Sequence, residues 1–372
     1  MASSRYPDWS GRLTRVRAAL TTRELDAVVI SDRTNILYLT GFSGSAGLLV
    51  LTADGARLLL DGRYDLVARQ AVTAGTMAEV AIVRVERRYD PALAGTVGTI
   101  GARRVGFEAA QVTVATLRAW QHAAPMVEWV PTDNLVERLR EVKDDWEIAV
   151  LRRGGRMMDA VAARLPAIVA AGRTERDVAD RIERALRDEG FSRPAFDTIV
   201  ASGPNSAHPH ARPGDRKLGP GDLVVLDFGG VLDGYCLDLT RMAAVGPISP
   251  AARELVDAVT RAHEAAVESV RPTIEAWQVD RAARAVLEAR GLGDAFSHST
   301  GHGLGLEVHE APRVGRADPD TPPCVLEAGM VFTIEPGAYL EHIGGVRVED
   351  DVLVTPTGAE LLTTASRELV AV

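Results

Sequence analysis

Four acidic residues interrupt apolar, strand-like segments in this 372-residue chain. The clearest case is Leu223-Val-Val-Leu-Asp227, where a carboxylate follows four apolar residues, and Asp238 comes eleven positions later. A buried carboxylate is costly without a compensating charge, so the chain must fold in a way that supplies one. A hairpin through Asp233-Gly234 would bring the two aspartates together on one face of a sheet. In that register Asp227 lies opposite Thr240 and diagonal to Asp238.

Two carboxylates held this close would repel each other, and one would stay protonated unless a cation lay between them. Divalent metal ions remove that electrostatic cost, so a metal site is the simplest explanation of the hairpin. The alternative is that Asp227 is a surface residue near the end of its strand. Taken alone, that position fits either explanation equally well.

The histidines cluster in the same half of the chain. Six of the eight fall between positions 208 and 342: His208, His210, His298, His302, His309 and His342. Three of them lie in the stretch 296–310, where interleaved glycines make a regular helix improbable and let backbone and ligand approach closely. A single histidine is more often a structural hydrogen-bonding residue, but three together favour a binding site.

Two glutamates complete the acidic set. Glu335 follows the apolar stretch 331–334, and Glu349 lies in the strand-like segment 344–354, where it would share a face with Arg347. Arg347 could neutralise Glu349 in a structural ion pair, or it could orient a bridging carboxylate or a substrate.

The charges suggest the number and the kind of metal. Four carboxylates carry four negative charges, which two divalent ions would balance if His302 were a neutral fifth ligand. Oxygen-rich ligation with one imidazole favours manganese or cobalt, and zinc is compatible with the ligand types. Two metals about 3.5–4 Å apart can hold a shared hydroxide and polarise the carbonyl that it attacks.

The chain is long enough for two domains, each with its own core. Residues 1–139 alternate short helical and strand-like segments, which predicts a small α/β domain with a hairpin turn at Asp54-Gly55. Residues 140–372 place helices and strands in blocks, which predicts an α+β domain with a largely antiparallel sheet. Its first long helix is expected to run to about 171. Three further helices are expected to begin after Thr174, Ser249 and Thr273. Strands are expected at 196–202, 222–230, 234–243, 330–335, 344–354 and 358–363.

Composition excludes several other classes of protein. The net charge of −9 is spread over both halves without a block rich in Lys and Arg, so we expect no nucleic-acid partner. The N-terminus lacks the apolar core of a signal peptide, and no apolar run reaches the roughly 18 residues that span a membrane. We therefore expect a cytoplasmic protein without membrane contact. Cys236 and Cys324 lack zinc-site spacing, and we interpret both as reduced structural residues.

The ordered set of two aspartates eleven residues apart, one histidine and two glutamates resembles that of the pita-bread metallopeptidases, the family of aminopeptidase P, prolidase and methionine aminopeptidase. The resemblance covers essentially the whole chain. It implies a pita-bread catalytic domain in which helices cover the antiparallel sheet. The segment Asn35-Ile-Leu-Tyr-Leu-Thr-Gly-Phe42 resembles the creatinase-like N-terminal domain of the proline-specific branch.

The resemblance also implies residue roles. The implied metal ligands are Asp227, Asp238, His302, Glu335 and Glu349, with Asp238 and Glu349 bridging the two ions. The implied substrate-binding residues are His210, His298, His309 and Arg347. Of these, His298, His309 and Arg347 would also assist catalysis, and Glu335 would act as the general base. His208 and His342 receive no role.

These features predict a dinuclear metallopeptidase that uses a bridging hydroxide to cleave the bond before a proline in the second position of a peptide. We expect an Xaa-Pro aminopeptidase, with an Xaa-Pro dipeptidase as the alternative that the motifs do not separate. Two other hypotheses are a non-catalytic module that binds peptides or proteins and a metal-dependent hydrolase of non-peptide amides or esters. The resemblance further implies a homodimer.

Overall fold

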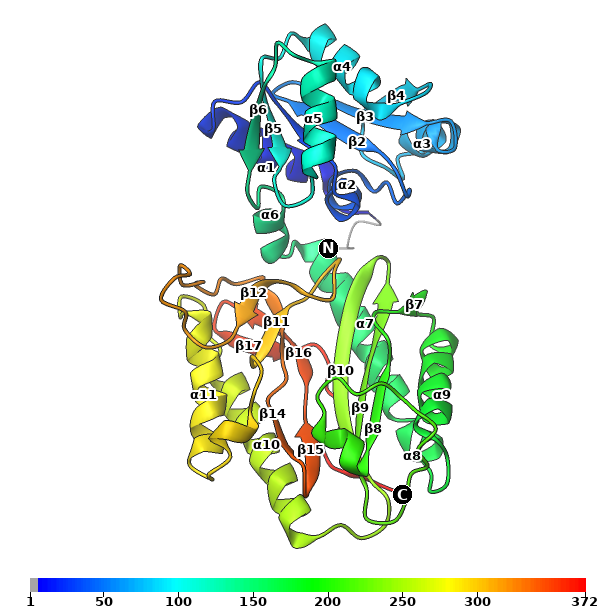
Figure 1. Cartoon of the computed structure of the whole chain (residues 1–372), viewed down its shortest axis with the longest axis vertical. Coiled ribbons are helices and arrows are strands. Elements are labelled where there is room, and N and C mark those ends of the chain that lie inside the picture. The colour runs from blue at the N-terminus through cyan, green and yellow to red at the C-terminus, as the bar shows by residue number, and fades with distance from the viewer. Residues whose placement is uncertain (1–5) are drawn as a thin grey trace. The chain divides into compact units, whose positions relative to one another are not determined.

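The computed structural model describes residues 6–372, and the chain divides into two compact units, residues 1–140 and residues 141–372 (Figure 1). The N-terminal unit contains the strands β1 (Ala27–Ile30), β2 (Leu48–Thr52), β3 (Ala56–Asp61), β4 (Ala81–Val85), β5 (Arg104–Glu108) and β6 (Glu128–Thr132). Its helices are α1 (Trp9–Thr22), α2 (Arg33–Thr40), α3 (Asp65–Thr73), α4 (Tyr89–Ile100), α5 (Val114–Ala123) and, at its end, α6 (Glu137–Glu141).

The six strands of this unit form one mixed sheet in the order β4-β3-β2-β1-β5-β6, which confirms the predicted α/β class. The predicted hairpin joins β2 and β3, but its turn lies one residue earlier than expected. The Thr52 amide donates to the Gly55 carbonyl, so Ala53 and Asp54 occupy the centre of the turn. The Thr52 hydroxyl donates to the Asp54 carboxylate at 2.8 Å, a side-chain bond that supports this position of the turn.

The C-terminal unit combines five α-helices with three sheets. Its strands are β7 (Arg193–Pro194), β8 (Ile199–Ser202), β9 (Leu223–Leu232), β10 (Tyr235–Ala244), β11 (Gly301–Gly303), β12 (Glu310–Val314), β13 (Val331–Ile334), β14 (Gly337–Leu340), β15 (Gly344–Arg347), β16 (Asp350–Thr355), β17 (Gly358–Leu361) and β18 (Val370–Ala371). Its helices are α7 (Asp145–Ala162), α8 (Leu165–Ile168), α9 (Glu175–Asp188), α10 (Pro250–Ser269) and α11 (Ala276–Glu288), with 3-10 turns η1 (Gly203–Ala207) and η2 (Gly293–Ala295).

Two five-stranded sheets and one two-stranded sheet make up this unit. The first has the order β18-β10-β9-β7, with β8 also paired to β9, and the second has the order β12-β11-β13-β16-β17. The third is the hairpin of β14 and β15. All pairs are antiparallel except β10 with β18, which confirms the predicted α+β class.

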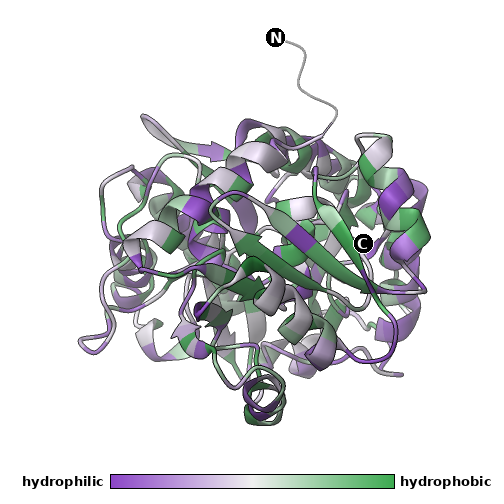
Figure 2. Cartoon of the chain, turned by 90° about the horizontal axis from the view of Figure 1, so that it is seen from above, coloured by the Kyte–Doolittle hydropathy of each residue, from purple (hydrophilic) through white to green (hydrophobic). Residues whose placement is uncertain are grey.

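The strand β9 lies between two hydrophobic clusters. Val224, Leu226 and Phe228 pack with apolar residues of α7 and α9, whereas Leu223 and Val225 pack with those of α10 and α11. Figure 2 shows for the chain as a whole that hydrophobic colour lies mainly on strands, whereas loops are mostly hydrophilic and helices are mixed. Because side chains alternate along a strand, the next residue on the Leu223 and Val225 side is Asp227.

Three predicted element boundaries differ from the structure. The helix expected to reach residue 171 ends at Ala162, because Pro166 cannot continue its hydrogen-bond ladder, and α8 follows as a separate turn. Thr273 does not cap a helix. It has a φ of 74° and donates its amide to the Leu326 carbonyl, and α11 begins only after Glu275.

The third difference concerns the predicted strand 344–354. It is divided into β15 and β16, which belong to different sheets, with Val348 and Glu349 between them. The expected helix starts at Thr174 and Ser249 are confirmed, since both side chains accept a hydrogen bond from the first turn. Among the described residues, no helix is both long and apolar enough to cross a membrane.

Candidate metal centre

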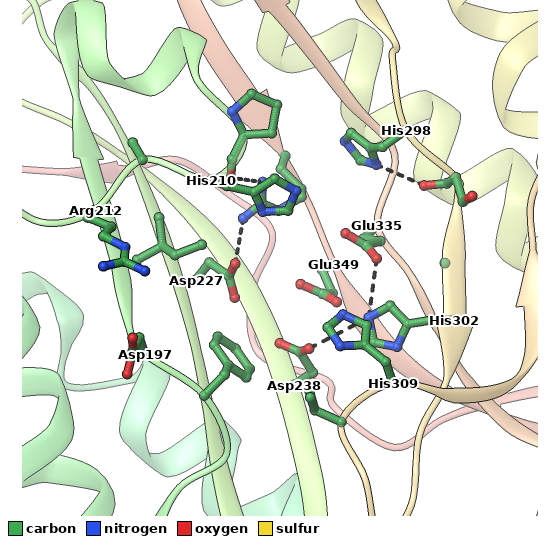
Figure 3. A pocket seen from close by; sticks show the side chains of 18 of the residues that line it. Asp197, His210, Arg212, Asp227, Asp238, His298, His302, His309, Glu335 and Glu349 are labelled. Atoms are coloured by element: carbon green, nitrogen blue, oxygen red, sulfur yellow. Dashed lines mark hydrogen bonds and ion pairs between the residues drawn. The ribbon is translucent and has the colours of Figure 1, made fainter. Parts of the chain in front are cut away.

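A cavity of about 550 Å³ lies in the C-terminal unit (Figure 3). Every site residue predicted from the sequence lines it: His210, Asp227, Asp238, His298, His302, His309, Glu335, Arg347 and Glu349. His208 and His342, to which no role was given, are not among the lining residues. The cavity therefore gathers residues from all three sheets of the unit and from the loops between them.

The hairpin of β9 and β10 supplies the two aspartates in the register expected from the sequence. Asp227 pairs with Thr240, and Asp238 pairs with Gly229, so the carboxylates are diagonal neighbours on the inner face. They are only 8% and 5% exposed. Figure 3 shows both side chains directed into the cavity. The alternative that Asp227 is a surface residue is wrong.

The second sheet supplies His302, which lies on the short strand β11 and not in an irregular loop. The flanking glycines allow this strand to pack against backbone on both sides. A Cβ at Gly301 would lie 1.8 Å from the Thr333 carbonyl oxygen, and one at Gly303 would lie 2.1 Å from the Ala311 carbonyl oxygen. Only glycine permits that approach, so the glycines place the His302 ring at the cavity wall.

The two glutamates reach the cavity from the ends of strands. Glu335 follows β13, and Glu349 lies in the gap between β15 and β16. The Nε2 of His302 is 3.4 Å from Glu335 Oε1 and 4.0 Å from Asp238 Oδ2. One ligand atom from each of Asp238, His302 and Glu349 lies within 4.8 Å of the others, a group that could hold a metal ion. Asp227 and Glu335 fall outside this closest group but line the same cavity.

The ring of His302 is oriented so that Nε2 can bind a metal ion. Its Nδ1 is 3.1 Å from the Gly303 carbonyl oxygen, to which it donates, and this leaves the Nε2 lone pair facing the carboxylates. Burial, together with the neighbouring His309, lowers the pKa of His302 to about 4. The ring is therefore neutral at ordinary pH.

The carboxylates are buried without enough partners. Burial raises the pKa of Asp227, and it raises the pKa of Glu335 to about 8. Burial and the charge of Glu349 raise the pKa of Asp238 well above its usual value. In the described part of the chain, Asp227 Oδ1 and Asp238 Oδ1 are buried and have no hydrogen-bond partner. Oxygen atoms in this state, next to a neutral imidazole, fit divalent cations.

A supporting layer behind the carboxylates was only partly predicted. The alternative predicted an ion pair between Arg347 and Glu349, but the structure pairs Arg347 with Asp227 instead. Its guanidinium donates to Asp227 Oδ2 at 2.5 Å and to Thr240 Oγ1 at 3.2 Å. Thr240 in turn donates to Glu349 Oε2 at 2.6 Å. The predicted register contained a signal for Thr240, because it placed that residue opposite Asp227.

Tyr339 was missed altogether. Its hydroxyl accepts from Arg347 at 3.0 Å and lies 2.9 Å from His298 Nε2. His298 Nδ1 lies 2.8 Å from the Ser299 carbonyl, so Nδ1 carries the proton and Nε2 accepts from Tyr339. Burial lowers the pKa of His298 to about 4, which agrees with this neutral ring. No spacing rule in the sequence points to Tyr339.

Further histidines and arginines line the cavity beside the carboxylates. His309 lies with its ring 4.2 Å from that of His302. His210 and Arg212 come from the loop after η1, and Arg313 comes from β12. Arg212 and Arg313 bring two positive charges to this lining and Asp197 brings one negative charge. Phe196, Ile199 and Pro209 add apolar surface, so this part of the cavity suits an organic substrate that carries a negative charge.

Known proteins resemble this chain along nearly its whole length. Residues 149–356 match the Metallopeptidase family M24, and residues 12–142 match the Creatinase/Prolidase N-terminal domain. The Xaa-Pro dipeptidase of Pyrococcus horikoshii is 33% identical over 96% of this chain and 98% of its own length.

Two solved structures show the same relationship. The Xaa-Pro dipeptidase from Bacillus anthracis is 33% identical with a TM-score of 0.93, and the match covers 98% of this chain and 100% of that one. The X-Pro aminopeptidase from Thermotoga maritima is 31% identical with a TM-score of 0.86, and the match covers 94% and 98%. The predicted family, fold class and enzyme class are thereby confirmed. The chain belongs to metallopeptidase family M24 and joins a creatinase/prolidase-type N-terminal domain to its peptidase domain.

Proposed function

We propose that this protein is an Xaa-Pro dipeptidase, which releases proline from a two-residue peptide with the help of two divalent metal ions. The expectation placed first from the sequence was an Xaa-Pro aminopeptidase, with the dipeptidase as its alternative. The match to dipeptidases of archaeal and bacterial origin over nearly the whole chain supports the alternative better.

The observation that carries the proposal is that one cavity contains both the acidic cluster and two arginines, Arg212 and Arg313. In a dipeptide the free carboxylate belongs to the residue directly after the scissile bond, so it lies close to the reacting carbonyl. Arginine suits a planar carboxylate because its guanidinium can form two parallel hydrogen bonds. A longer peptide has a neutral amide at that place and gains less from either arginine.

Five residues would hold the two ions in this proposal: Asp227, Asp238, His302, Glu335 and Glu349. Manganese is favoured by the oxygen-rich set, and cobalt or zinc is compatible with it. When bound, the ions supply a nucleophile at neutral pH and polarise the scissile carbonyl.

The remaining residues orient and transfer protons. Arg347 and Thr240 keep the carboxylates of Asp227 and Glu349 fixed, since each donates a hydrogen bond to one of them. Glu335 would hold the proton that is released during attack. His309, beside His302, would donate to the substrate carbonyl oxygen, and His298 and Arg347 would assist it. His210, which also lines the cavity, would bind the substrate.

The same proposal includes the wider organisation of the protein. Residues 1–139 would form the N-terminal domain and residues 140–372 the catalytic domain of a cytoplasmic homodimer.

The test starts from enzyme stripped with chelator and resupplied with manganese, cobalt or zinc. We expect a metal to restore hydrolysis of Ala-Pro and Gly-Pro, with little activity on Ala-Pro-Ala, and we expect the Asp238→Asn variant to be inactive. Preference for the tripeptide would overturn the dipeptidase proposal in favour of an aminopeptidase. Binding of two metals without cleavage of any of these peptides would move the search to other amides or esters.

A second comparison tests the arginine argument directly. Arg313→Gln should raise the KM for Ala-Pro more than the KM for its prolinamide analogue, which lacks the carboxylate. The control is Arg316→Gln, three positions further along the chain and outside the cavity lining. Equal effects of Arg313→Gln on both substrates would show that Arg313 does not bind the carboxylate.

A further inference from the structure

One loop forms a continuous part of the cavity wall. Residues 209–213 all line the cavity, and they include His210 and Arg212, whose side chains are exposed. The loop contains none of the candidate metal ligands. It also lies outside any strand or helix, so no ladder of backbone hydrogen bonds fixes its course. The Arg347 guanidinium donates to the Pro209 carbonyl at 3.2 Å at the start of this stretch, and the rest of the loop needs a further support.

Glu175, the first residue of α9, is placed to provide that support. It is completely buried, at 0% exposure, and is not among the residues that line the cavity. Its Oε1 accepts from the Ser202 amide at 2.8 Å and from the Ser202 hydroxyl at 2.7 Å. The Asn205 side-chain amide donates to both carboxylate oxygens, at 3.0 and 3.1 Å. The Gly214 amide donates to Oε2 at 3.1 Å.

These contacts join the two ends of the loop. Ser202 and Asn205 precede the cavity-lining residues, and Gly214 follows them. A single carboxylate thus closes the loop at its base, and all its partners are donors. Backbone bonds from Glu175 to Arg216 and from Arg176 to Gly214 reinforce the closure, but they do not depend on the carboxylate.

We propose that Glu175 is a positioning residue that sets substrate affinity by fixing the loop of His210 and Arg212, without touching substrate or metal. The inference rests on the proposed function, because it assigns that loop to the substrate. It separates two parts of the site. The sheets and the turns between their strands hold the metals, and the loop closed by Glu175 presents His210 and Arg212 to the peptide.

The test compares Glu175→Gln with Asp177→Asn in the metal-loaded, full-length enzyme. Glutamine has nearly the same shape, but its amide nitrogen would face a donor of the loop. Asp177 lies in the same first turn of α9, and among the described residues its carboxylate accepts a hydrogen bond from the Thr174 amide, three positions earlier, and from none of the loop donors, so its variant controls for the loss of charge. The measurements are kcat and KM for Ala-Pro, metal content, and hydrogen exchange of peptides that cover residues 202–214.

For Glu175→Gln we expect faster exchange in the loop and a KM raised about tenfold, with kcat and metal content close to those of the wild type. Asp177→Asn should leave all four quantities unchanged. If Glu175→Gln loosens the loop but leaves KM as it was, the loop does not set affinity and the inference is wrong. A parallel loss of kcat and metal would also overturn it, because Glu175 would then support the whole site.

A second variant keeps the inference testable if Glu175→Gln does not fold. Asn205→Ala keeps Glu175 but removes two of the five hydrogen bonds that its carboxylate accepts. It should show the same pattern with a smaller rise in KM. If the wild type does not cleave Ala-Pro, the proposed function fails. Hydrogen exchange then tests the role of Glu175 separately. Faster exchange of the loop in the variants would show that Glu175 holds it, and unchanged exchange would show that it does not.

Discussion

The two units each bury a carboxylate in a sheet, Glu108 in β5 and Asp238 in β10, at 4% and 5% exposure. Glu108 is fully partnered. Its oxygens accept from the Ser31 amide and hydroxyl, from the Asp32 amide and from the Asn35 side chain, at 2.6–3.0 Å. Asp238 Oδ1 has no partner among the described residues. Burial alone therefore does not mark a functional site. What distinguishes Asp238 is an unpartnered carboxylate oxygen on a residue that lines a cavity, where an additional ligand can compensate its charge.

The largest effect should come from Asp238→Asn. This change keeps the shape of the side chain but removes the charge that the metals would neutralise. We expect kcat/KM for Ala-Pro to fall by about 10³-fold or more and the bound metal to fall below two ions per chain. Elemental analysis and steady-state kinetics measure both. If the variant kept two ions and its activity, Asp238 would not be needed for metal binding, and it would be a structural carboxylate like Glu108.

Removal of the metals should have the next largest effect. Without them the carboxylates of the C-terminal unit repel one another, whereas Glu108 keeps all its partners. At a free metal concentration a hundredfold above Kd, each bound ion stabilises the folded state by about 2.7 kcal/mol, or about 5–10 °C in Tm. Scanning calorimetry with and without chelator measures this shift. An unchanged Tm would mean that the cluster does not need cations to fold.

The converse substitution, Glu108→Gln, should affect stability only. In the wild type the donors around Glu108 face a carboxylate oxygen, whereas in the variant some of them would face the amide nitrogen, which is itself a donor. This costs about 1–3 kcal/mol of the free energy of unfolding. Urea denaturation measures that loss. Activity per folded molecule should stay at the wild-type level, and a specific loss of kcat would show that the partnered carboxylate also serves the reaction.

The smallest effect concerns His298, a partnered group inside the site. Its pKa is lowered by burial from the usual 6.5 to about 4, so between these values the unfolded chain binds more protons than the folded one. The stability that depends on the neutral ring is present above pH 6.5 and is lost as the pH falls towards 4. In metal-free protein, His298→Gln should reduce this loss in thermal melts. Identical pH dependence would assign the acid sensitivity to other groups.

The sequence was sufficient to single out residues that the fold gathers in one cavity, because each one breaks a local pattern. A charged residue in an apolar strand and a histidine among glycines are visible without a structure. The register of β9 and β10 was also predictable, since Asp233-Gly234 fixes the turn and the pairing follows from it.

Features that depend on distant partners could not be predicted. The segment 344–354 reads as one strand, but β15 pairs with β14 and β16 pairs with β13, so the chain changes sheets at Glu349. Thr273 looks like a helix cap, yet its amide bonds to the Leu326 carbonyl. Tyr339 contacts His298, 41 positions away, and Glu175 contacts Ser202, 27 positions away, and no local spacing encodes such contacts.

The distribution of the site over three sheets has a consequence for the order of folding. No single hairpin contains the whole cluster: β9 and β10 carry the aspartates, β11 carries His302, and Glu349 is fixed only where β15 gives way to β16. Closing such long loops is slow, and the contacts that they bring together form late. A metal ion would therefore find its full set of ligands only in a chain that has nearly finished folding. The time course of metal uptake would report the completion of the fold, and not its beginning.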